Sequence, residues 1–226
     1  MANYAGFTGS APVAPGSIAS AYGSFGTVAT TSAPTLNPMP REIAGLRVRV
    51  GGQDAPLYFV SSGQINFVIP IGVAPGQQTV EVVSGGNVIS RGNVLVWDFG
   101  PGLAVSDPRP ASMQGIVQNQ DFAVNGTNAR AKRGEVISIY ATGCGQTQPA
   151  LADGAPPAQL SRATATVEVY VANDKAEVQF AGAHPLYPGI CQINAVIPNK
   201  AYLSGQSPLY FTVNGMPSNA VAVWIE

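Results

Sequence analysis

The chain has 226 residues, of which 26 are glycine, 19 are proline and only 10% are charged. An average soluble domain carries about 25% charged residues. A formal net charge of −1 excludes the basic surface that nucleic acids and anionic membranes require. With one histidine and two cysteines, a single copy has too few ligands for a multi-histidine or four-cysteine metal site. Hydrophobic residues, at 46%, suffice for a folded core.

The first forty residues, which we call the leading segment, contain no charged side chain, because the first one is Arg41. Exposed edge strands are usually protected by charge. An uncharged segment that can form strands therefore needs cover from its own domain or from another molecule. We predict that it forms the assembly interface between copies through six apolar residues: Tyr4, Phe7, Val13, Ile18, Tyr22 and Phe25.

Strands are expected along the rest of the chain. Hydrophobic and polar residues alternate at 46–50 and at 166–171, which is typical of strands with one buried face. Turn sequences separate such runs at 85–87, 125–126 and 214–215, where glycine and asparagine supply the positive φ angles of tight hairpins. No window shows a helical stripe of hydrophobic residues. The sequence therefore predicts an all-β protein.

The sequence also repeats itself. Three stretches of the first half are echoed in the same order in the second: 15–23 by 133–141, 63–70 by 190–198, and 93–97 by 219–224. This order indicates two copies of one unit of about 100 residues, the size of an immunoglobulin-like module. Glycine and proline at 100–102 mark the boundary. We predict two tandem immunoglobulin-like β-sandwich modules, 1–100 with the leading segment and 101–226.

Two cysteines, Cys144 and Cys191, lie beside strand-like runs of the second half. They are either two buried free thiols or one disulfide. The low charge and the polar uncharged surface favour the disulfide, which stabilises such a fold by about 4 kcal/mol. No apolar run reaches the roughly 18 residues of a membrane span. The N-terminus lacks a basic and apolar leader, so we expect a mature or trimmed product, located outside the cell or on its surface.

Catalytic groups are sparse in this sequence. His184, the single histidine, lies in a proline-rich loop, and no Gly-x-Ser-x-Gly nucleophile motif accompanies it. We therefore predict no catalytic residue, no metal ligand and no cofactor. Asn125 begins an Asn-Gly-Thr acceptor sequence and is a candidate glycosylation site. Five tyrosines are candidates for stacking against sugars: Tyr58, Tyr170, Tyr187, Tyr202 and Tyr210.

Several stretches carry a family resemblance. They are 39–52 and 55–67, which includes a Ser-Gly-Gln-Ile-Asn core, the opening at 13–18, and 119–121, 134–136 and 140–143 in the second half. They resemble the Solibacter-type uncharacterised C-terminal domain family of secreted bacterial proteins, and the likeness extends from near Asn3 to the end. The resemblance implies tandem immunoglobulin-like modules, usually at the end of larger exported proteins, with no assigned activity. Because the module makes up nearly the entire chain, we expect a self-sufficient role.

Together these features predict a non-enzymatic extracellular structural protein. We expect copies of the chain to self-assemble into a bacterial surface filament or layer, each extended segment adding a strand to a neighbouring sheet. Head-to-tail repetition of such a contact produces an open filament. The alternative is a cell-surface adhesin or carbohydrate-binding module, with glycans as partners. Neither nucleic acid nor a membrane span is expected.

Overall fold

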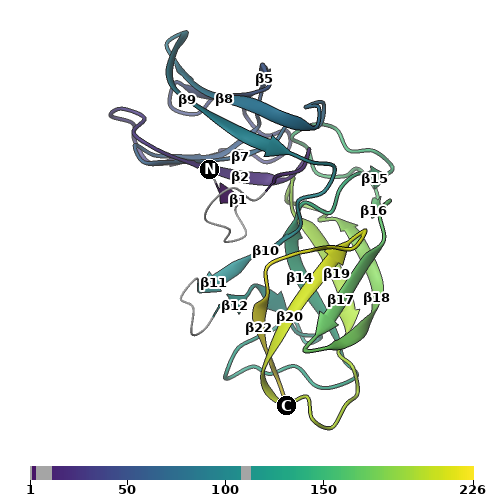
Figure 1. Ribbon diagram of the computed structural model, residues 1–226. Coiled ribbons are helices and arrows are strands. Elements are labelled where there is room, and N and C mark those ends of the chain that lie inside the picture. The colour runs from purple at the N-terminus through teal and green to yellow at the C-terminus, as the bar shows by residue number, and fades with distance from the viewer. Residues whose placement is uncertain (1, 4–11, 108–112) are drawn as a thin grey trace.

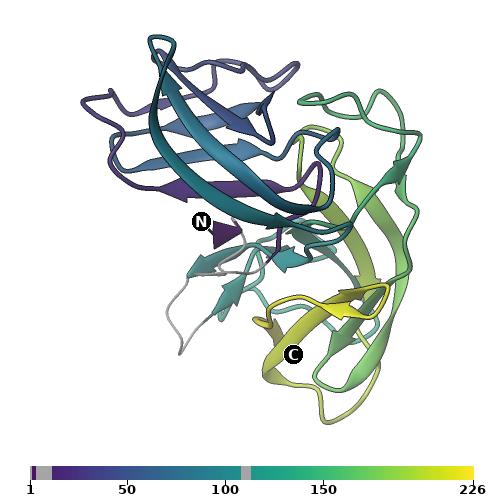
Figure 2. The same ribbon diagram turned by 45° about the horizontal axis from the view of Figure 1, so that its top comes forward.

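The computed structural model describes residues 2–3, 12–107 and 113–226, and the regular structure within these ranges consists of strands (Figure 1). The all-β prediction is therefore confirmed for this part of the chain. The first half of the chain lies above the second half in Figure 1, and Figure 2 shows both halves in a tilted view. In the ranges described, no helix with the length and hydropathy of a membrane span is present.

Two sheets make up the first half. Their strands are β1 (Ala2–Asn3), β2 (Ile18–Tyr22), β3 (Thr31–Ser32), β4 (Leu46–Val50), β5 (Gln53–Asp54), β6 (Leu57–Val60), β7 (Gln64–Val68), β8 (Gly76–Ser84) and β9 (Asn87–Val96). One sheet has the order β1-β2-β7-β6-β3 and the other the order β5-β4-β8-β9. Alternate residues of β4 are buried, as the sequence pattern predicts. A hydrophobic cluster drawn from residues 13–96 includes side chains of both sheets, which therefore pack face to face.

The second half forms one larger sheet. Its strands are β10 (Gly102–Leu103), β11 (Val105–Asp107), β12 (Gln114–Gly115), β13 (Val117–Gln118), β14 (Val136–Thr142), β15 (Thr147–Gln148), β16 (Arg162–Ala163), β17 (Val167–Val171), β18 (Asp174–Ala183), β19 (Cys191–Val196), β20 (Gly205–Val213), β21 (Met216–Pro217) and β22 (Val221–Ile225). The main path through this sheet is β10-β14-β19-β18-β17-β20-β22-β12-β11.

Strand β18 connects the two sides of this sheet. Residues 174–176 of the strand pair with β17, whereas residues 177–183 pair with β19. Because one long strand belongs to both sides, the sheet curls around a second hydrophobic cluster, drawn from residues 103–225. The second half is thus one nearly closed sheet rather than the pair of separate sheets expected of a sandwich.

The sequence repeat recurs in the strand pairing. The equivalent pairs are Ser20–Asn66 and Tyr22–Gln64 between β2 and β7, and Ser138–Asn194 and Tyr140–Gln192 between β14 and β19. The third echo falls on β9 and β22, the last strand of each half. The same residue types therefore occupy the same register positions in both halves.

Two of the three predicted hairpin turns are confirmed. Residues 85–86, with φ angles of 55° and 83°, connect β8 to β9, and residues 214–215, with φ angles of 46° and 82°, connect β20 to β21. The prediction for 125–126 is wrong, because the tight turn lies at 127–128, between two residues that bridge one another.

The leading segment is built into the first half. Strand β1 pairs antiparallel with β2, with Ala2 opposite Ser20. The Val13 N–H donates to the Leu95 carbonyl over 3.0 Å, and the Trp97 N–H donates to the Val13 carbonyl over 2.9 Å. Strand β2 and Val13 are therefore paired within their own chain rather than left open for a neighbour.

Candidate ligand-binding site

Hydrogen bonds fix the two halves against each other. The Ile18 N–H donates to Thr142 Oγ1 over 2.9 Å, and Thr142 Oγ1 donates to the Gly189 carbonyl over 2.8 Å. The Tyr58 hydroxyl donates to the Pro188 carbonyl over 2.5 Å. Since Ile18 and Tyr58 belong to the first half and their partners to the second, these bonds set the angle between the halves.

A close backbone contact completes the junction. Gly143 has a φ angle of 75°, and a Cβ atom at this position would lie 1.9 Å from the Gly100 carbonyl oxygen. The Gly100 N–H donates to the Gly143 carbonyl over 3.1 Å. An ion pair of 2.9 Å between Arg41 and Asp153 also spans the halves. The space between the halves is consequently a preformed cleft, which reduces the cost of ordering a site around a ligand.

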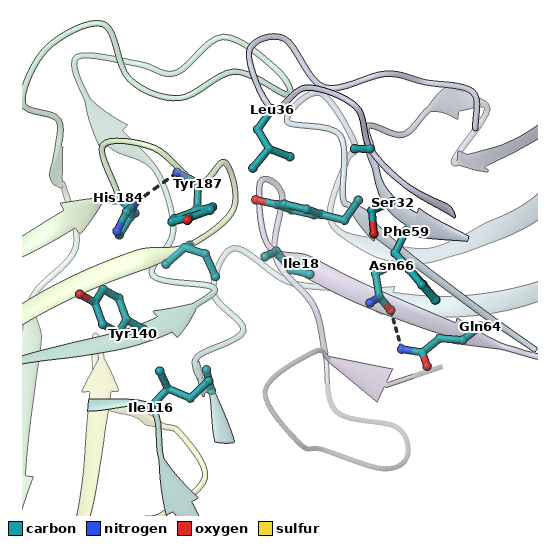
Figure 3. Close-up of a pocket in the computed structure, with 14 residues that line it drawn as sticks. Ile18, Ser32, Leu36, Phe59, Gln64, Asn66, Ile116, Tyr140, His184 and Tyr187 are labelled. Atoms are coloured by element: carbon teal, nitrogen blue, oxygen red, sulfur yellow. Dashed lines mark hydrogen bonds between the residues drawn. The ribbon is translucent and has the colours of Figure 1, made fainter. Parts of the chain in front are cut away.

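This cleft has a volume of about 780 Å³, in the range of small-molecule sites (Figure 3). Strands β2, β6 and β7 form one wall, and β14 with the loop before β19 forms the other. The lining residues are Ile18, Ser32, Ala33, Leu36, Tyr58, Phe59, Gln64, Asn66, Ala104, Ile116, Tyr140, His184, Tyr187 and Ile190.

An amide cluster forms part of the first wall. Asn66 Oδ1 accepts hydrogen bonds from the Ser20 hydroxyl and from Gln64 Nε2, each over 2.8 Å. These bonds assign the orientation of both amides. Within the described ranges, Asn66 Nδ2 and Gln64 Oε1 have no hydrogen-bond partner, and both side chains are half-buried. In Figure 3 the Asn66 amide nitrogen points toward the opposite wall. The wall thus offers one free donor group and one free acceptor.

Aromatic rings form much of the remaining surface. The His184 ring centroid lies 4.9 Å from that of Tyr187 and 5.6 Å from that of Tyr140, with tilted planes. Tyr58 and Phe59 line the first wall. Burial raises the pKa of the Tyr140 hydroxyl, and nearby Tyr187 raises it further, so this phenol stays neutral. The cleft therefore combines apolar ring surfaces with a few polar groups, which suits an amphipathic ligand.

His184 holds the loop that carries Tyr187. Its Nδ1 accepts hydrogen bonds from the backbone N–H groups of Leu186, over 3.0 Å, and of Tyr187, over 3.2 Å. The proton of the neutral imidazole is therefore on Nε2. Burial lowers the pKa of His184 below its usual 6.5. The neutral ring is thus a fixed part of the wall.

The lowered pKa of His184 predicts a loss of stability in mild acid. The unfolded chain, with an ordinary histidine pKa, binds the proton more readily than the folded chain. The stabilising contribution is therefore complete above pH 6.5 and is lost as the pH falls toward the folded-state pKa. We expect the free energy of unfolding to fall more between pH 7.5 and pH 5 in the wild type than in His184→Asn, measured by urea titration. Equal falls in both proteins would contradict this.

The cysteines lie beside the cleft. Cys144 and Cys191 form a disulfide with an S–S distance of 2.09 Å, and 47 positions separate them in the sequence. Both are buried in the core cluster of the second half. Cys191 follows Ile190, which lines the cleft. The bond thus ties the start of β19 to the loop after β14, close to the junction.

The six residues predicted to face a neighbouring copy differ in their exposure in the structure. Outside the described residues lie Tyr4 and Phe7. Val13 and Phe25 are buried in the core of the first half, and Ile18 is buried at the junction with Val68. For these three the expectation of an exposed assembly surface is corrected, because the leading segment pairs with strands of its own chain. Tyr22, 63% exposed, remains accessible.

Asn125 is not an accessible glycosylation site. Its side chain is 2% exposed, and its Nδ2 donates to Asn119 Oδ1 and to the Trp224 carbonyl, each over 2.8 Å. A glycan on this nitrogen has no room and would break both bonds. The candidate from the sequence is therefore corrected: the amide is a structural group of the second half.

Two of the five candidate tyrosines come together. Tyr58 and Tyr187 line the cleft. Tyr170 and Tyr210 instead stack on each other, with centroids 4.9 Å apart, on β17 and β20. Tyr202 lies elsewhere and donates its hydroxyl proton to Asp174. Position in the sequence alone did not distinguish the two groups.

Gln64 and Asn66 were missed by sequence reasoning. They belong to the Gln-Ile-Asn stretch that recurs at 192–194, which we took as a sign of repetition and of family resemblance but not as part of a site. A signal in the sequence could have identified them: two polar residues that are two positions apart in a strand share one face, and this face points away from the core.

Possible metal ligands and the contacts of His184 can be followed in the residues that the structure describes. In those ranges no group of three His, Cys, Asp or Glu side chains comes together as metal ligands. The His184 Nδ1 accepts its hydrogen bonds from backbone N–H groups, and among the described residues no carboxylate orients the ring as in a Ser-His-Asp site.

Comparison with known proteins gives no family. No family model matches the chain, and no curated protein matches it. Among solved structures, it is similar to the Bacteroides ovatus mixed-linkage glucan utilization locus protein SGBP-B in complex with a mixed-linkage heptasaccharide. The identity is 12%, the alignment covers 95% of this chain and 43% of that chain, and the TM-score is 0.36. This chain thus spans less than half the length of that protein.

Two further similar structures cover nearly the whole chain. They are domains 5–6 of the S-layer protein SbsC, with 14% identity, 96% and 92% coverage and a TM-score of 0.28, and titin A168169, with 10% identity, 96% and 93% coverage and a TM-score of 0.28. At these identities and TM-scores the similarities carry no argument about function.

Proposed function

We propose that this protein is a non-enzymatic extracellular protein that binds a glycan in the cleft between its two halves. One observation carries the proposal: a preformed cleft combines aromatic rings with an amide donor, Asn66 Nδ2, and an amide acceptor, Gln64 Oε1, that have no partner among the described residues. A sugar has the complementary surface. Its hydroxyl groups donate and accept hydrogen bonds at the rim, and its C–H groups form an apolar face that packs on aromatic rings.

The same surfaces suggest a class of glycan. Aromatic side chains contact sugars through flat faces, and pyranoses with mostly equatorial substituents have the flattest ones. Chains of such sugars with β-linkages are extended ribbons that present one face after another. We therefore propose β-linked polysaccharides of the glucose, xylose or mannose type as ligands.

The extracellular location rests on the disulfide. Disulfides persist in oxidising compartments and are rare in the cytosol. Cys144 and Cys191 are bonded, and no described cysteine is free. The scarcity of charged residues fits a protein that works at a polysaccharide-rich surface rather than on nucleic acid.

Glycan binding predicts slower migration in native gels that contain hydroxyethylcellulose, xylan or glucomannan. Tyr187→Ala should weaken the binding about tenfold, because the 47% exposed ring lines the cleft. The matched control is Tyr202→Ala, which removes a 67% exposed tyrosine outside the cleft and should leave migration unchanged. Unretarded wild type in all three gels, or equal effects of both substitutions, would contradict the proposal.

Self-assembly by strand addition is a second candidate function, and β1 is the observation in its favour. This strand consists of Ala2–Asn3 alone and pairs with the edge of β2. A short terminal strand exchanged between copies would join them head to tail into a filament or layer. The absence of charge before Arg41 removes the usual protection against such exchange.

Deletion of residues 1–11 tests this candidate. It should abolish filaments seen by negative-stain electron microscopy and leave a folded monomer. The deletion must end before Pro12, because Val13 is buried and hydrogen-bonded to β9. Thermal unfolding of the shortened chain provides the control for folding. Filaments that persist in the shortened chain, or that the full chain never forms, would rule out strand addition by β1.

Two finer points belong to the proposal. One is the division into tandem immunoglobulin-like modules at 100–101, supported by two hydrophobic clusters that end at Val96 and begin at Leu103. The other is membership of the Solibacter-type family, supported by the sequence stretches described above.

A further inference from the structure

A second copy of the amide cluster lies on the second half. Asn194 Oδ1 accepts hydrogen bonds from the Ser138 hydroxyl over 3.2 Å and from Gln192 Nε2 over 3.0 Å. These bonds reproduce those of the first cluster, donor by donor. In the described part of the chain, Asn194 Nδ2 and Gln192 Oε1 also lack partners, and both side chains are half-buried. The second cluster therefore offers the same free donor and the same free acceptor.

Aromatic residues accompany both clusters in the same register. The equivalent pairs are Phe59–Asn66 with Tyr22–Gln64, and Phe180–Asn194 with Tyr140–Gln192. In both halves a register shift directly precedes the phenylalanine. Five side-chain types thus recur at matching positions on three neighbouring strands. In the second half the Arg162 guanidinium also lies 5.1 Å from the Phe180 ring centroid.

The second cluster adjoins the cleft through Tyr140. Residues two apart in a strand share a face, so Ser138 lies on the same face of β14 as Tyr140. Their β19 partners, Asn194 and Gln192, lie on that face too. Ile139, which stands between Ser138 and Tyr140 in β14, points to the other face and is buried in the core. Tyr140 lines the cleft, whereas Ser138, Gln192 and Asn194 lie outside its lining. A ligand that extended past Tyr140 along this face of the sheet would reach the second cluster.

We infer that the second cluster is a second sugar subsite, and that the protein binds an extended β-linked polysaccharide across both clusters. This inference rests on the proposed function. Its specific content is that the ligand covers several sugar residues, with the first cluster inside the cleft and the second outside it. In both halves the Asn Nδ2 and Gln Oε1 atoms of the cluster are half-buried and have no partner among the described residues, so they remain open to the hydroxyl groups of a sugar.

Calorimetry with short and long probes tests the inference. The probes are cellobiose and cellohexaose, xylobiose and xylohexaose, and mannobiose and mannohexaose. For the series that binds, the hexasaccharide should bind about tenfold more tightly than the disaccharide, since one further set of hydrogen bonds is made. Asn194→Ala should remove this gain and leave disaccharide binding unchanged, whereas Asn66→Ala should weaken both. Asn93→Ala, at an exposed position of β9, is the control.

The outcomes separate the two proposals. Equal binding of short and long probes, or an Asn194→Ala protein that binds the hexasaccharide normally, would overturn the second subsite and leave glycan binding in the cleft intact. A wild type that binds none of the six probes would overturn both. Thermal unfolding checks that each variant is folded. If Asn194→Ala does not fold, Phe180→Leu serves instead, because it keeps apolar bulk but removes the flat ring. This variant should lose the tighter binding of the hexasaccharide and keep normal binding of the disaccharide.

Discussion

Loss of the disulfide in Cys144→Ser/Cys191→Ser is expected to lower the free energy of unfolding by about 4 kcal/mol. The two cysteines are 47 positions apart, so the bond removes many conformations from the unfolded chain. Both belong to the core cluster of the second half, and their hydroxyl replacements would lie in apolar surroundings. An effect of this size is a large fraction of the stability of an ordinary domain.

Urea unfolding, extrapolated linearly to water, measures this loss. Cys144→Ala/Cys191→Ala is the matched variant, because it removes the bond without burying a hydroxyl group. The wild type in dithiothreitol removes the bond without any substitution. All three should lose most of the 4 kcal/mol. If the alanine variant is as stable as the oxidised wild type, the disulfide does not stabilise the fold.

Asn125→Ala is expected to cost about 3 kcal/mol, because the side chain acts as a strand partner for β22. The Trp224 N–H donates to Asn125 Oδ1 over 2.7 Å, and Asn125 Nδ2 donates to the Trp224 carbonyl over 2.8 Å. Asn125 Nδ2 also donates to Asn119 Oδ1. Alanine leaves these buried groups without partners, and that desolvation cost is the main part of the effect.

The control for Asn125→Ala is Asn128→Ala, three residues away in the exposed turn. It should change the free energy of unfolding by less than about 0.5 kcal/mol. Asn125→Asp adds a second test, because a carboxylate oxygen in place of Nδ2 faces two acceptors and should destabilise at least as much as alanine. Equal, small effects of all three substitutions would show that the amide is not a structural group.

The strands and two of the hairpin turns were predictable because their causes are local. Alternation at 46–50 requires only that one face meet a core, and the glycines at 85–86 need only the positive φ angles of their own turn. Asn125 shows where this reasoning ends. Its neighbour Gly126 suggested a tight turn, but the contact with Trp224, 99 positions away, decided its role.

The leading segment shows a second limit. Lack of charge indicated that it needs cover, which is correct for Val13, Ile18 and Phe25. Composition contains no information on which molecule supplies the cover, because burial in the same chain and burial in a neighbour favour the same residues. Pairing of β1 with β2 and of Val13 with β9 gives that answer for the described residues.

The sequence by itself determined the all-β class, the recurrence of one polar pattern in two halves, and the scarcity of catalytic groups. These follow from composition and from short-range periodicity. The tertiary structure decided that β18 joins two sides of one sheet, that the junction at Thr142 and Gly143 fixes the halves, and that Asn66 lines the same cleft as His184 and Tyr187. The Ile18–Thr142 bond and the two walls of the cleft join residues more than a hundred positions apart, and only the packing of complete sheets brings them together.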